Sequence, residues 1–326
     1  MDLAKVDGMG IKEIFRKQGG LGLLKQYFRG GALGTAILEF MILGRDRKAL
    51  EILRLAAEYK IKKKLEKKYA AEILAFNDQY EDNLPHRQSN KVWVCWFQGM
   101  ENAPDLVRRC YQSLQDNLTD RDIVLITAQN MGEYVRFPEH IMEKWKSGQI
   151  SNTHMTDLLR LELLIQYGGM WIDATVLCTC KREDIPEYYF DSDLFFYQAL
   201  KPGVDGQSAF VSSWLISASA NNKVLMLTRY LCYEYWLTHR DMVDYYLFHD
   251  FMCIALEHNE EDWKKVVPRD NEGPHILLLR LFEEYDEQIF DCVTGQEPFH
   301  KLSYKFSSDQ FERADTFYSK IMNFRR

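Results

Sequence analysis

One segment near the middle of the chain, "TDLLRLELLIQYGGMWIDATV" at Thr156–Val176, restricts the possible folds more than any other. Leucine and isoleucine lie on every side of the helix that we expect over Asp157–Tyr167, so this helix is predicted to be buried. Thr156 is the expected cap at its start, and Gly168–Gly169 ends it. An apolar strand then leads to Asp173. A buried helix followed at once by a buried strand is typical of an α/β fold.

The chain before this segment alternates strands and helices. We expect strands over residues 91–99 and 122–128 and helices over residues 104–115 and 139–146. Such alternation is typical of a sheet with parallel strands, in which ligands bind at the carboxyl ends of the strands. The candidate ligand contacts at these ends are Trp96, Gln98, Asp173 and Thr175. Further along the chain, helices are expected near residues 222–237 and 241–258.

The N-terminal region differs from the rest of the chain in charge. Ten basic and four acidic side chains lie between Arg45 and Lys68, whereas the whole chain carries a net charge of −7. The negative total argues against a general nucleic-acid-binding protein. Apolar residues recur at helical spacing over residues 49–76, and the opposite face is rich in lysine. Two interpretations are open: a solvated helix packed on the main domain, or a basic amphipathic unit bound to an anionic membrane surface.

We expect a linker containing Pro85 to separate a helical, basic N-terminal membrane-association region (residues 1–85) from a second domain (residues 90–326). The first 18 residues lack the apolar core of a secretory signal. The longest uncharged run nearby, Gly30–Leu38, is far shorter than the roughly 20 residues that span a bilayer. The seven cysteines are scattered, which predicts reduced thiols rather than a disulfide framework. We therefore expect a cytoplasmic protein, peripheral on the inner face of the cell membrane.

Three charged side chains stand out in the apolar segment. Asp157 and Arg160 are three residues apart and share one face of the expected helix. In a buried helix such a pair is costly unless it meets a polar cleft or a ligand; a simple ion pair is the alternative. Asp173 ends a strand that is too apolar to lie at the surface. An unpaired carboxylate is costly in such a buried position. A carboxylate there can hold a divalent cation or accept hydrogen bonds from sugar hydroxyls; a capped turn is the alternative.

Sequence motifs of several common enzyme classes, among them the P-loop, the dinucleotide-binding glycine motif and the zinc-protease HExxH, do not occur. The order [ST]-D-x-x-R, apolar helix, Gly-Gly and aromatic-x-Asp-x-x-V instead resembles the Asp-x-Asp region of glycosyltransferase family 32. It is most similar to the bacterial capsular polysaccharide synthesis proteins related to that family. "VWVCWFQGMENAP", "HKLSYK" and the basic helix "EILRLAAEYKIKKKLEKKY" also resemble these proteins, so the resemblance covers nearly the whole chain.

The resemblance implies a GT-A-like α/β fold over residues 90–326: a Rossmann-like, nucleotide-sugar-binding mixed sheet flanked by helices. It also implies a nucleotide-diphosphate-sugar donor and retention of the anomeric configuration. Matched by position, Trp96 corresponds to the aromatic residue that stacks on the nucleotide base. Asp157 and Arg160 correspond to the pair that contacts the donor sugar, and Asp173 to the first aspartate of Asp-x-Asp, near the ribose and the metal. We therefore expect Asp157, Arg160 and Asp173 to be catalytic.

The second aspartate of Asp-x-Asp, usually the direct metal ligand, is Thr175 in this chain. A hydroxyl is a poor ligand for Mn²⁺ or Mg²⁺ compared with a carboxylate. A divalent cation held by Asp173, phosphate oxygens and water is one expectation. An enzyme that needs no metal and an inactive site are the other two.

Polar residues near the C-terminus are further candidates. His300, Lys301 and Lys305 in "FHKLSYK" are expected to face the diphosphate of the donor; surface lysines and a satisfied buried histidine are the alternative. His249 and Asp250 form another polar pair within an apolar helix. Adjacent helical residues point to different sides, so at most one of them is expected to serve the site.

Together these features predict a membrane-associated glycosyltransferase. It would transfer a hexose to a lipid-linked glycan during capsular or extracellular polysaccharide biosynthesis, beside other polysaccharide-assembly proteins. The main alternative is a catalytically degenerate protein that binds nucleotide or glycan as a scaffold. A glycoside hydrolase would need a second carboxylate paired with Asp173 across the sugar, and the sequence shows no clear partner of that kind.

Overall fold

The computed structural model describes residues 20–81, 83–199 and 209–323 of the chain. Its centre is a five-stranded sheet in the order β2 (Asp122–Ile126), β1 (Lys91–Cys95), β3 (Gly169–Ile172), β6 (Val211–Ala218) and β5 (Leu194–Gln198). Strands β2, β1 and β3 are parallel, whereas β6 runs antiparallel to both β3 and β5. The sheet is therefore mixed, and its parallel half is the one that the sequence predicted.

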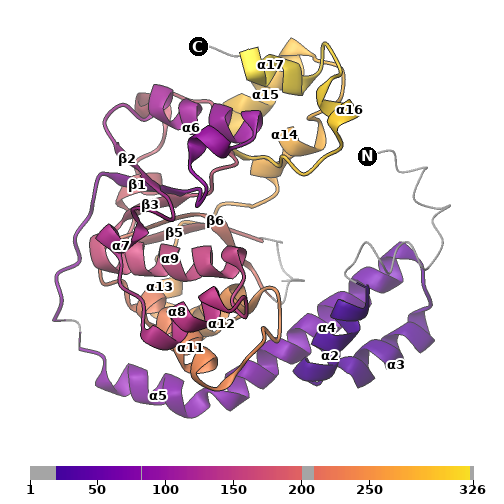
Figure 1. The fold of residues 1–326 in the computed structure, drawn as a ribbon, viewed down its shortest axis with the longest axis vertical. Coiled ribbons are helices and arrows are strands. Elements are labelled where there is room, and N and C mark those ends of the chain that lie inside the picture. The colour runs from indigo at the N-terminus through magenta and orange to yellow at the C-terminus, as the bar shows by residue number, and fades with distance from the viewer. Residues whose placement is uncertain (1–19, 82, 200–208, 324–326) are drawn as a thin grey trace.

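Helices cover both faces of this sheet (Figure 1). Side chains of successive strand residues point to opposite faces, so β1 buries Trp93 in one apolar core and Val92 in another. The core that contains Trp93 is closed by α7 (Met131–Tyr134), α8 (Glu139–Lys146), α9 (Asn152–Tyr167), α11 (Lys223–Thr238), α12 (Leu247–Glu257) and α13 (Glu260–Trp263). The mixed α/β fold with flanking helices is thus confirmed.

The other face packs against a second, smaller layer. Its elements are η2 (Met100–Asn102), α6 (Asp105–Asn117), η3 (Arg182–Asp184), α10 (Tyr188–Asp191) and an antiparallel pair, β4 (Val176–Cys178) with β7 (Phe299–Lys301). The remaining C-terminal helices lie beyond this pair, at the top of Figure 1: η4 (Gly273–His275), α14 (Ile276–Leu279), α15 (Glu287–Gln296), α16 (Ser308–Phe311) and α17 (Phe317–Asn323). The β4–β7 pair brings the C-terminal part of the chain next to the end of β3.

The N-terminal region is helical, as predicted: α2 (Gly20–Gly30), α3 (Leu33–Leu43), α4 (Arg47–Lys68) and α5 (Ala70–Gln79). The single helix expected over residues 49–76 is divided at Tyr69, and Asp46 caps its start by accepting from the N–H of Ala49 at 2.9 Å. Helix α4 packs against α12, where Lys62 forms an ion pair with Glu257. Helices α2 and α3 extend away from the sheet (Figure 1).

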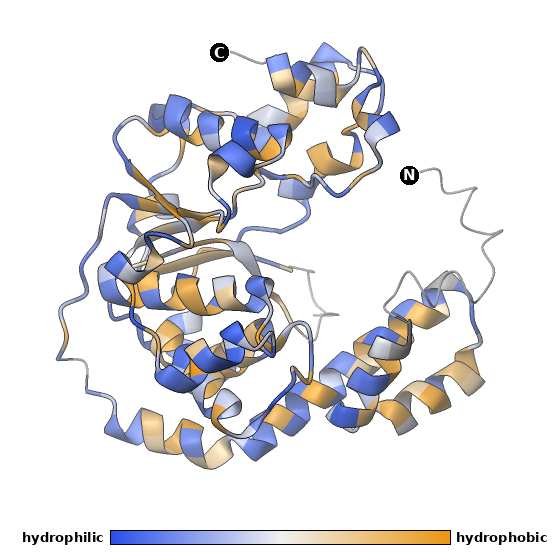
Figure 2. Ribbon diagram, viewed as in Figure 1, coloured by the Kyte–Doolittle hydropathy of each residue, from blue (hydrophilic) through white to orange (hydrophobic). Residues whose placement is uncertain are grey.

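No helix within the described ranges has both the length and the apolar character needed to cross a bilayer. Helix α3 is nevertheless strongly apolar, as its orange colour in Figure 2 shows. All seven cysteines are free thiols, in agreement with the prediction.

Candidate active site

Helix α9, which carries two of the predicted residues, begins earlier than the sequence suggested. Its first residue is Asn152, and the hydroxyl of Ser151 accepts a hydrogen bond from the backbone N–H of His154 at 3.2 Å. The prediction of Thr156 as the cap is wrong, because its hydroxyl lies inside the helix and donates to the carbonyl of Thr153. The additional turn places His154 on the same face as Asp157, three residues later.

Two glycines turn the chain from α9 into β3. Gly168 has a φ of 68° and Gly169 a φ of 95°, values that other residues rarely adopt. A Cβ on Gly168 would lie 2.7 Å from the carbonyl oxygen of Arg87, and one on Gly169 would overlap that of Lys91. No larger residue fits, so the predicted Gly-Gly break is required. It places β3 directly beside β1 and brings Asp173 to the carboxyl end of the central strand.

Arg160 joins the two predicted carboxylates. Its guanidinium donates to Asp157 Oδ1 at 2.5 Å and to Asp173 Oδ1 at 3.2 Å, and it lies 4.9 Å from the centre of the Trp171 ring. Trp171 Nε1 also donates to Asp173 Oδ1 at 3.0 Å. Arg160 and Asp157 are buried, whereas the side chain of Asp173 is 28% exposed. The predicted pair of Asp157 and Arg160 therefore exists, and Asp173 is the one of the three residues whose side chain reaches solvent.

His154, which the sequence did not reveal as a candidate, is the second partner of Asp157. Its Nδ1 lies 3.3 Å from Asp157 Oδ2, while its Nε2 accepts from the indole N–H of Trp236 at 3.0 Å. Because the indole can only donate, Nδ1 is the nitrogen that donates to the carboxylate. Burial raises the pKa of Asp157, but Arg160 and His154 outweigh burial and hold this pKa below its ordinary value. Asp157 therefore stays ionised.

A second cation reaches Asp173 from the C-terminal part of the chain. Lys301 Nζ forms an ion pair with Asp173 Oδ2 at 3.1 Å and donates to the hydroxyl of Thr175 at 2.5 Å. Lys301 is the last residue of β7 and is paired with Val176 of β4. The structure thus brings together a residue predicted from "HKLSYK" and two predicted from the Asp-x-Asp-like segment.

These side chains open into a cleft of about 1520 Å³. Asp157, Arg160, Asp173 and Lys301 all line it. The N-terminal helix α4 and the segments around α12 and η4 contribute further polar side chains: Lys48, Arg54, Glu58, Tyr246, Asn271 and His275. Helix α4 therefore forms part of the cleft wall. The spacing of apolar residues along this helix did not predict that role.

His249 also lines the cleft, whereas its neighbour Asp250 is buried and does not. This agrees with the prediction that at most one of the two serves the site. Burial lowers the pKa of His249 to about 4, so its ring is neutral at pH 7. Its Nδ1 has no hydrogen-bond partner within the described part of the chain. This nitrogen is buried, so the contact of His249 with the cleft does not by itself assign it a ligand.

The other predicted contacts lie outside the residues that line the cleft. His300 is fully buried, its Nε2 lies 3.2 Å from the Thr179 hydroxyl, and strand alternation turns it away from Lys301. The expectation that His300 faces a diphosphate is therefore wrong. Lys305 and Gln98 are exposed, and Trp96 is half-buried with its ring 5.6 Å from that of Tyr304. Their roles toward a donor stay predictions.

The side chains around Asp173 do not form an ordinary site for a divalent cation. Such ions prefer several oxygen ligands, among which carboxylates dominate. Oδ1 of Asp173 already accepts from Arg160 and Trp171, Oδ2 is paired with Lys301, and the Thr175 hydroxyl accepts from the same lysine. Within the described ranges, no three His, Cys, Asp or Glu side chains are close enough to hold one metal ion. The predicted Mn²⁺ or Mg²⁺ therefore does not fit the donor groups present.

Two curated relatives match part of the chain. O-glycosyltransferase PaGT of Phomopsis amygdali is 26% identical over 147 residues, which cover 40% of this chain and 35% of that protein. O-glycosyltransferase braB of Annulohypoxylon truncatum is 33% identical over 140 residues, which cover 37% of this chain and 32% of that protein. The chain thus spans about a third of the length of these relatives. Both come from fungi, so the bacterial source and the relationship to glycosyltransferase family 32 stay predictions.

A solved structure, the PaToxG glycosyltransferase, covers 82% of this chain and 97% of its own, with 14% identity and a TM-score of 0.37. A score this low does not establish a shared fold. The family model described as capsular polysaccharide synthesis protein matches residues 46–321. This match contains α4, the Asp157–Asp173 segment and Lys301, which together form the cleft. Because it covers most of the chain, the protein belongs to the capsular polysaccharide synthesis protein family.

Proposed function

We propose that this protein is a glycosyltransferase that moves a hexose from a nucleotide-diphosphate sugar to a glycan acceptor in the biosynthesis of a capsular or extracellular polysaccharide. The observation that carries the proposal is the arrangement of Asp157, Arg160 and Asp173 at the carboxyl end of β3, inside a large cleft. This edge of an α/β sheet is where ligands bind. Family membership and two partial O-glycosyltransferase relatives support the same activity.

In this proposal the sugar and the diphosphate of the donor lie in the cleft, and the base extends beyond the residues that line it. Asp173, a partly exposed carboxylate, accepts hydrogen bonds from hydroxyl groups of the donor, and the His249 ring lines the same cleft. Arg160 fixes Asp157 and Asp173 relative to each other. The nucleotide base stacks on Trp96, which packs edge-on against Tyr304, three residues beyond Lys301. The base is thereby assigned to Trp96 and Tyr304, and the diphosphate to the nearby Lys301.

The proposed reaction proceeds with retention at the anomeric carbon of the donor. The bond from this carbon to the β-phosphate oxygen breaks, and that oxygen takes the electron pair. The hydroxyl oxygen of the acceptor bonds to the same face of the carbon, and its proton moves to the departing phosphate. The products are a glycoside and a nucleoside diphosphate. Negative charge grows on the phosphate during this step, so cationic side chains aimed at it lower the barrier.

Turnover of UDP- and GDP-hexoses by the wild type and Asp173→Asn tests this function. The substitution keeps the size of the side chain but removes its charge, so we expect kcat/KM for donor hydrolysis or transfer to fall by about 100-fold or more. Asp309→Asn, at an exposed aspartate of α16, is the matched control and should behave as the wild type. Nucleotide or glycan binding without turnover by the wild type would favour the scaffold alternative instead.

We further propose that α2 and α3 hold the protein on an anionic membrane surface. Within the described ranges, eight of the sixteen exposed large hydrophobic side chains lie on these two helices, and Phe28, Met41 and Ile42 are each at least 66% exposed. The exposed basic residues Lys25 and Arg45 lie at the same end of the chain. Exposed apolar surface next to positive charge is typical of helices that lie in the lipid interface.

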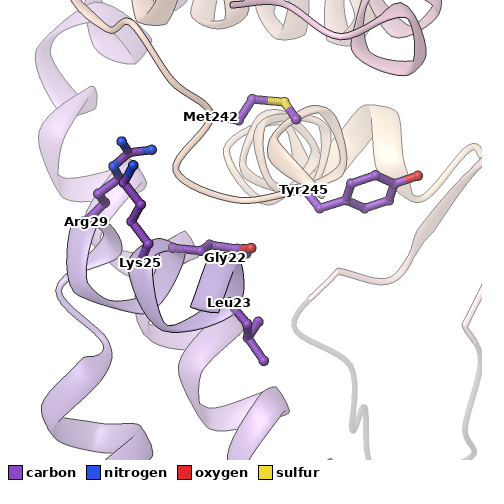
Figure 3. Close-up of a pocket in the computed structure, with 7 residues that line it drawn as sticks. Gly22, Leu23, Lys25, Arg29, Met242 and Tyr245 are labelled. Atoms are coloured by element: carbon purple, nitrogen blue, oxygen red, sulfur yellow. The ribbon is translucent and has the colours of Figure 1, made fainter. Parts of the chain in front are cut away.

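The position of the cleft supports a lipid-linked acceptor. Helix α4 connects the apolar helices to the cleft and contributes Arg54 to its wall. A smaller hollow of about 380 Å³ lies between α2 and the loop before α12, with Tyr245 on one side (Figure 3). Tyr245 lines the main cleft as well. An acceptor whose lipid is inserted beside α2 and α3 would therefore enter the cleft from its α4 side.

A further inference from the structure

The ammonium group of Lys301 contacts both residues that correspond to the aspartates of an Asp-x-Asp motif. It lies 3.1 Å from Asp173 Oδ2 and 2.5 Å from Thr175 Oγ1, between the two residues that correspond to the motif. An ammonium carries three N–H groups, so these two partners leave at least one for a ligand. The side chain of Lys301 is 22% exposed, and it lines the cleft. A phosphate oxygen can therefore reach it.

Both anchors of this ammonium are rigid. Lys301 belongs to β7, which pairs with β4, and the N–H of Leu302 donates to the carbonyl of Thr175 at 3.0 Å. Thr175 itself is only 9% exposed. The backbone on each side of the Lys301–Thr175 hydrogen bond is thus fixed by strand pairing. A donor group held in this way loses little freedom when a ligand binds.

The charges around Asp173 are already balanced. Asp157 and Asp173 contribute two negative charges, and Arg160 and Lys301 contribute two positive charges. His249 and His275 also line the cleft, and burial lowers the pKa of both rings, so they add no charge at pH 7. An additional divalent cation would find no uncompensated carboxylate beside Asp173. A diphosphate, in contrast, would find an ammonium with a free N–H.

We infer that Lys301, oriented by Thr175, is the resident cation that binds the diphosphate of the donor in place of a divalent metal. This inference rests on the proposed function and names the residue that neutralises its leaving group. As the bond between the anomeric carbon and the β-phosphate oxygen breaks, the Lys301 ammonium donates to the oxygen that gains the negative charge. Thr175 is a positioning residue: its hydroxyl holds the ammonium at the cleft and does not itself contact the donor.

Calorimetric binding of UDP, GDP, ADP and dTDP to the full chain, in EDTA and in Mn²⁺, tests the inference without turnover. We expect the nucleotide that binds best to have the same Kd within about twofold in both buffers. Lys301→Met keeps the aliphatic stem but removes the charge. Because a charged hydrogen bond to phosphate contributes about tenfold or more to affinity, we expect the variant to bind the nucleotide about tenfold more weakly or worse. Lys264→Ala, at an exposed lysine of the α13 C-terminus, is the matched control and should bind as the wild type.

The role of Thr175 is tested by two variants of similar size. Thr175→Val removes the hydroxyl and should weaken nucleotide binding several-fold, whereas Thr175→Ser should restore it. Circular dichroism melts of all variants show which of them are folded. Nucleotide binding by the wild type that requires Mn²⁺, or a Lys301→Met variant that is folded and binds normally, would overturn the inference but leave the proposed function standing. The absence of nucleotide binding in both buffers would instead contradict the proposed function itself.

Discussion

Around Asp173 the protein buries charge, whereas along α2 and α3 it exposes apolar surface. Arg160 is 3% exposed and Asp157 7%, although such residues are rarely buried. Phe28 and Met41, in contrast, are 72% and 70% exposed, although such residues are usually found inside. Each region departs from the usual distribution of residues between core and surface: the first buries charged side chains, and the second exposes apolar ones.

The two regions differ in where their compensation comes from. The buried charges are compensated within the molecule, because Arg160 bonds both carboxylates and Lys301 pairs with the second. The apolar face of α2 and α3 has no comparable cover within the described ranges. We conclude that the first region is a preorganised polar site; the second is the region that we propose to meet a membrane surface. The following predictions test this contrast, from the largest expected effect to the smallest.

Removing Arg160 should have the largest effect. Arg160→Met keeps much of the side-chain volume but leaves Asp157 and Asp173 without their shared partner. Breaking a buried ion pair on one side costs about 3–5 kcal/mol, so urea unfolding should show a loss of that order, and nucleotide-sugar turnover should be abolished. The triple variant Asp157→Asn/Arg160→Met/Asp173→Asn should recover part of the stability but none of the activity. A loss below about 1 kcal/mol in the single variant would contradict a compensated buried pair.

His300 is a buried titratable group without a counter-charge. In contrast to the compensated charges around Arg160, it should make the stability of the protein depend on pH. Burial lowers its pKa to about 4, so between pH 6.5 and 4 the unfolded chain binds a proton that the folded chain does not. The contribution of His300 to stability is therefore present above pH 6.5 and is lost as the pH falls. Between pH 6.5 and 5 the stability of His300→Asn relative to the wild type should rise by about 2 kcal/mol, measured by urea unfolding at each pH. A difference independent of pH would show that His300 is not buried as a neutral ring.

The apolar face should affect location rather than stability. The triple variant Phe28→Ser/Met41→Ser/Ile42→Ser removes the three most exposed apolar side chains of α2 and α3. Flotation with anionic liposomes should fall by about tenfold or more, while the melting temperature stays unchanged. Leu279→Ser, at a residue of α14 that is 71% exposed, is the matched control and should float as the wild type. Equal flotation of the triple variant and the wild type would contradict the membrane proposal.

An exposed ion pair should matter least. Lys264 pairs with Glu261 at 2.6 Å on the surface of α13, where water and salt screen the interaction. Lys264→Ala should leave unfolding by urea, nucleotide binding and flotation unchanged. A measurable loss of stability would show that the contrast between buried and exposed pairs is weaker in this protein than proposed.

Much of the fold follows from the local pattern. Strands β1 and β2 lie within the predicted residues, and α8 spans the predicted residues 139–146, because hydrophobic periodicity reports directly which residues are buried. The boundaries of the elements were harder to predict. Helix α12 begins at Leu247 rather than near residue 241, and α9 begins at Asn152 because Ser151, not Thr156, caps it. Several polar residues near a helix start can serve as a cap, and only the packed structure selects one.

The candidate site was predictable in part. Asp157, Arg160 and Asp173 were found because charge within an apolar segment is costly unless it is compensated. His154 was missed because its relation to Asp157 depends on the true start of α9. His300 was assigned wrongly. It and Lys301 are consecutive residues of β7, so their side chains point to opposite faces, and no local signal shows which face meets the cleft.

The amino-acid sequence by itself determined the alternating α/β pattern, the Gly-Gly break and the three charges that had to find partners, because periodicity and the cost of burying charge act over short stretches of chain. Only the tertiary structure decided which partners they found. Lys301 is 126 residues from Thr175, and β4 and β7 bring the two together. Strand pairing across such a distance depends on the packing of the whole molecule. The meaning of Thr175, which looked like a missing metal ligand, therefore became visible only beside the lysine that it orients.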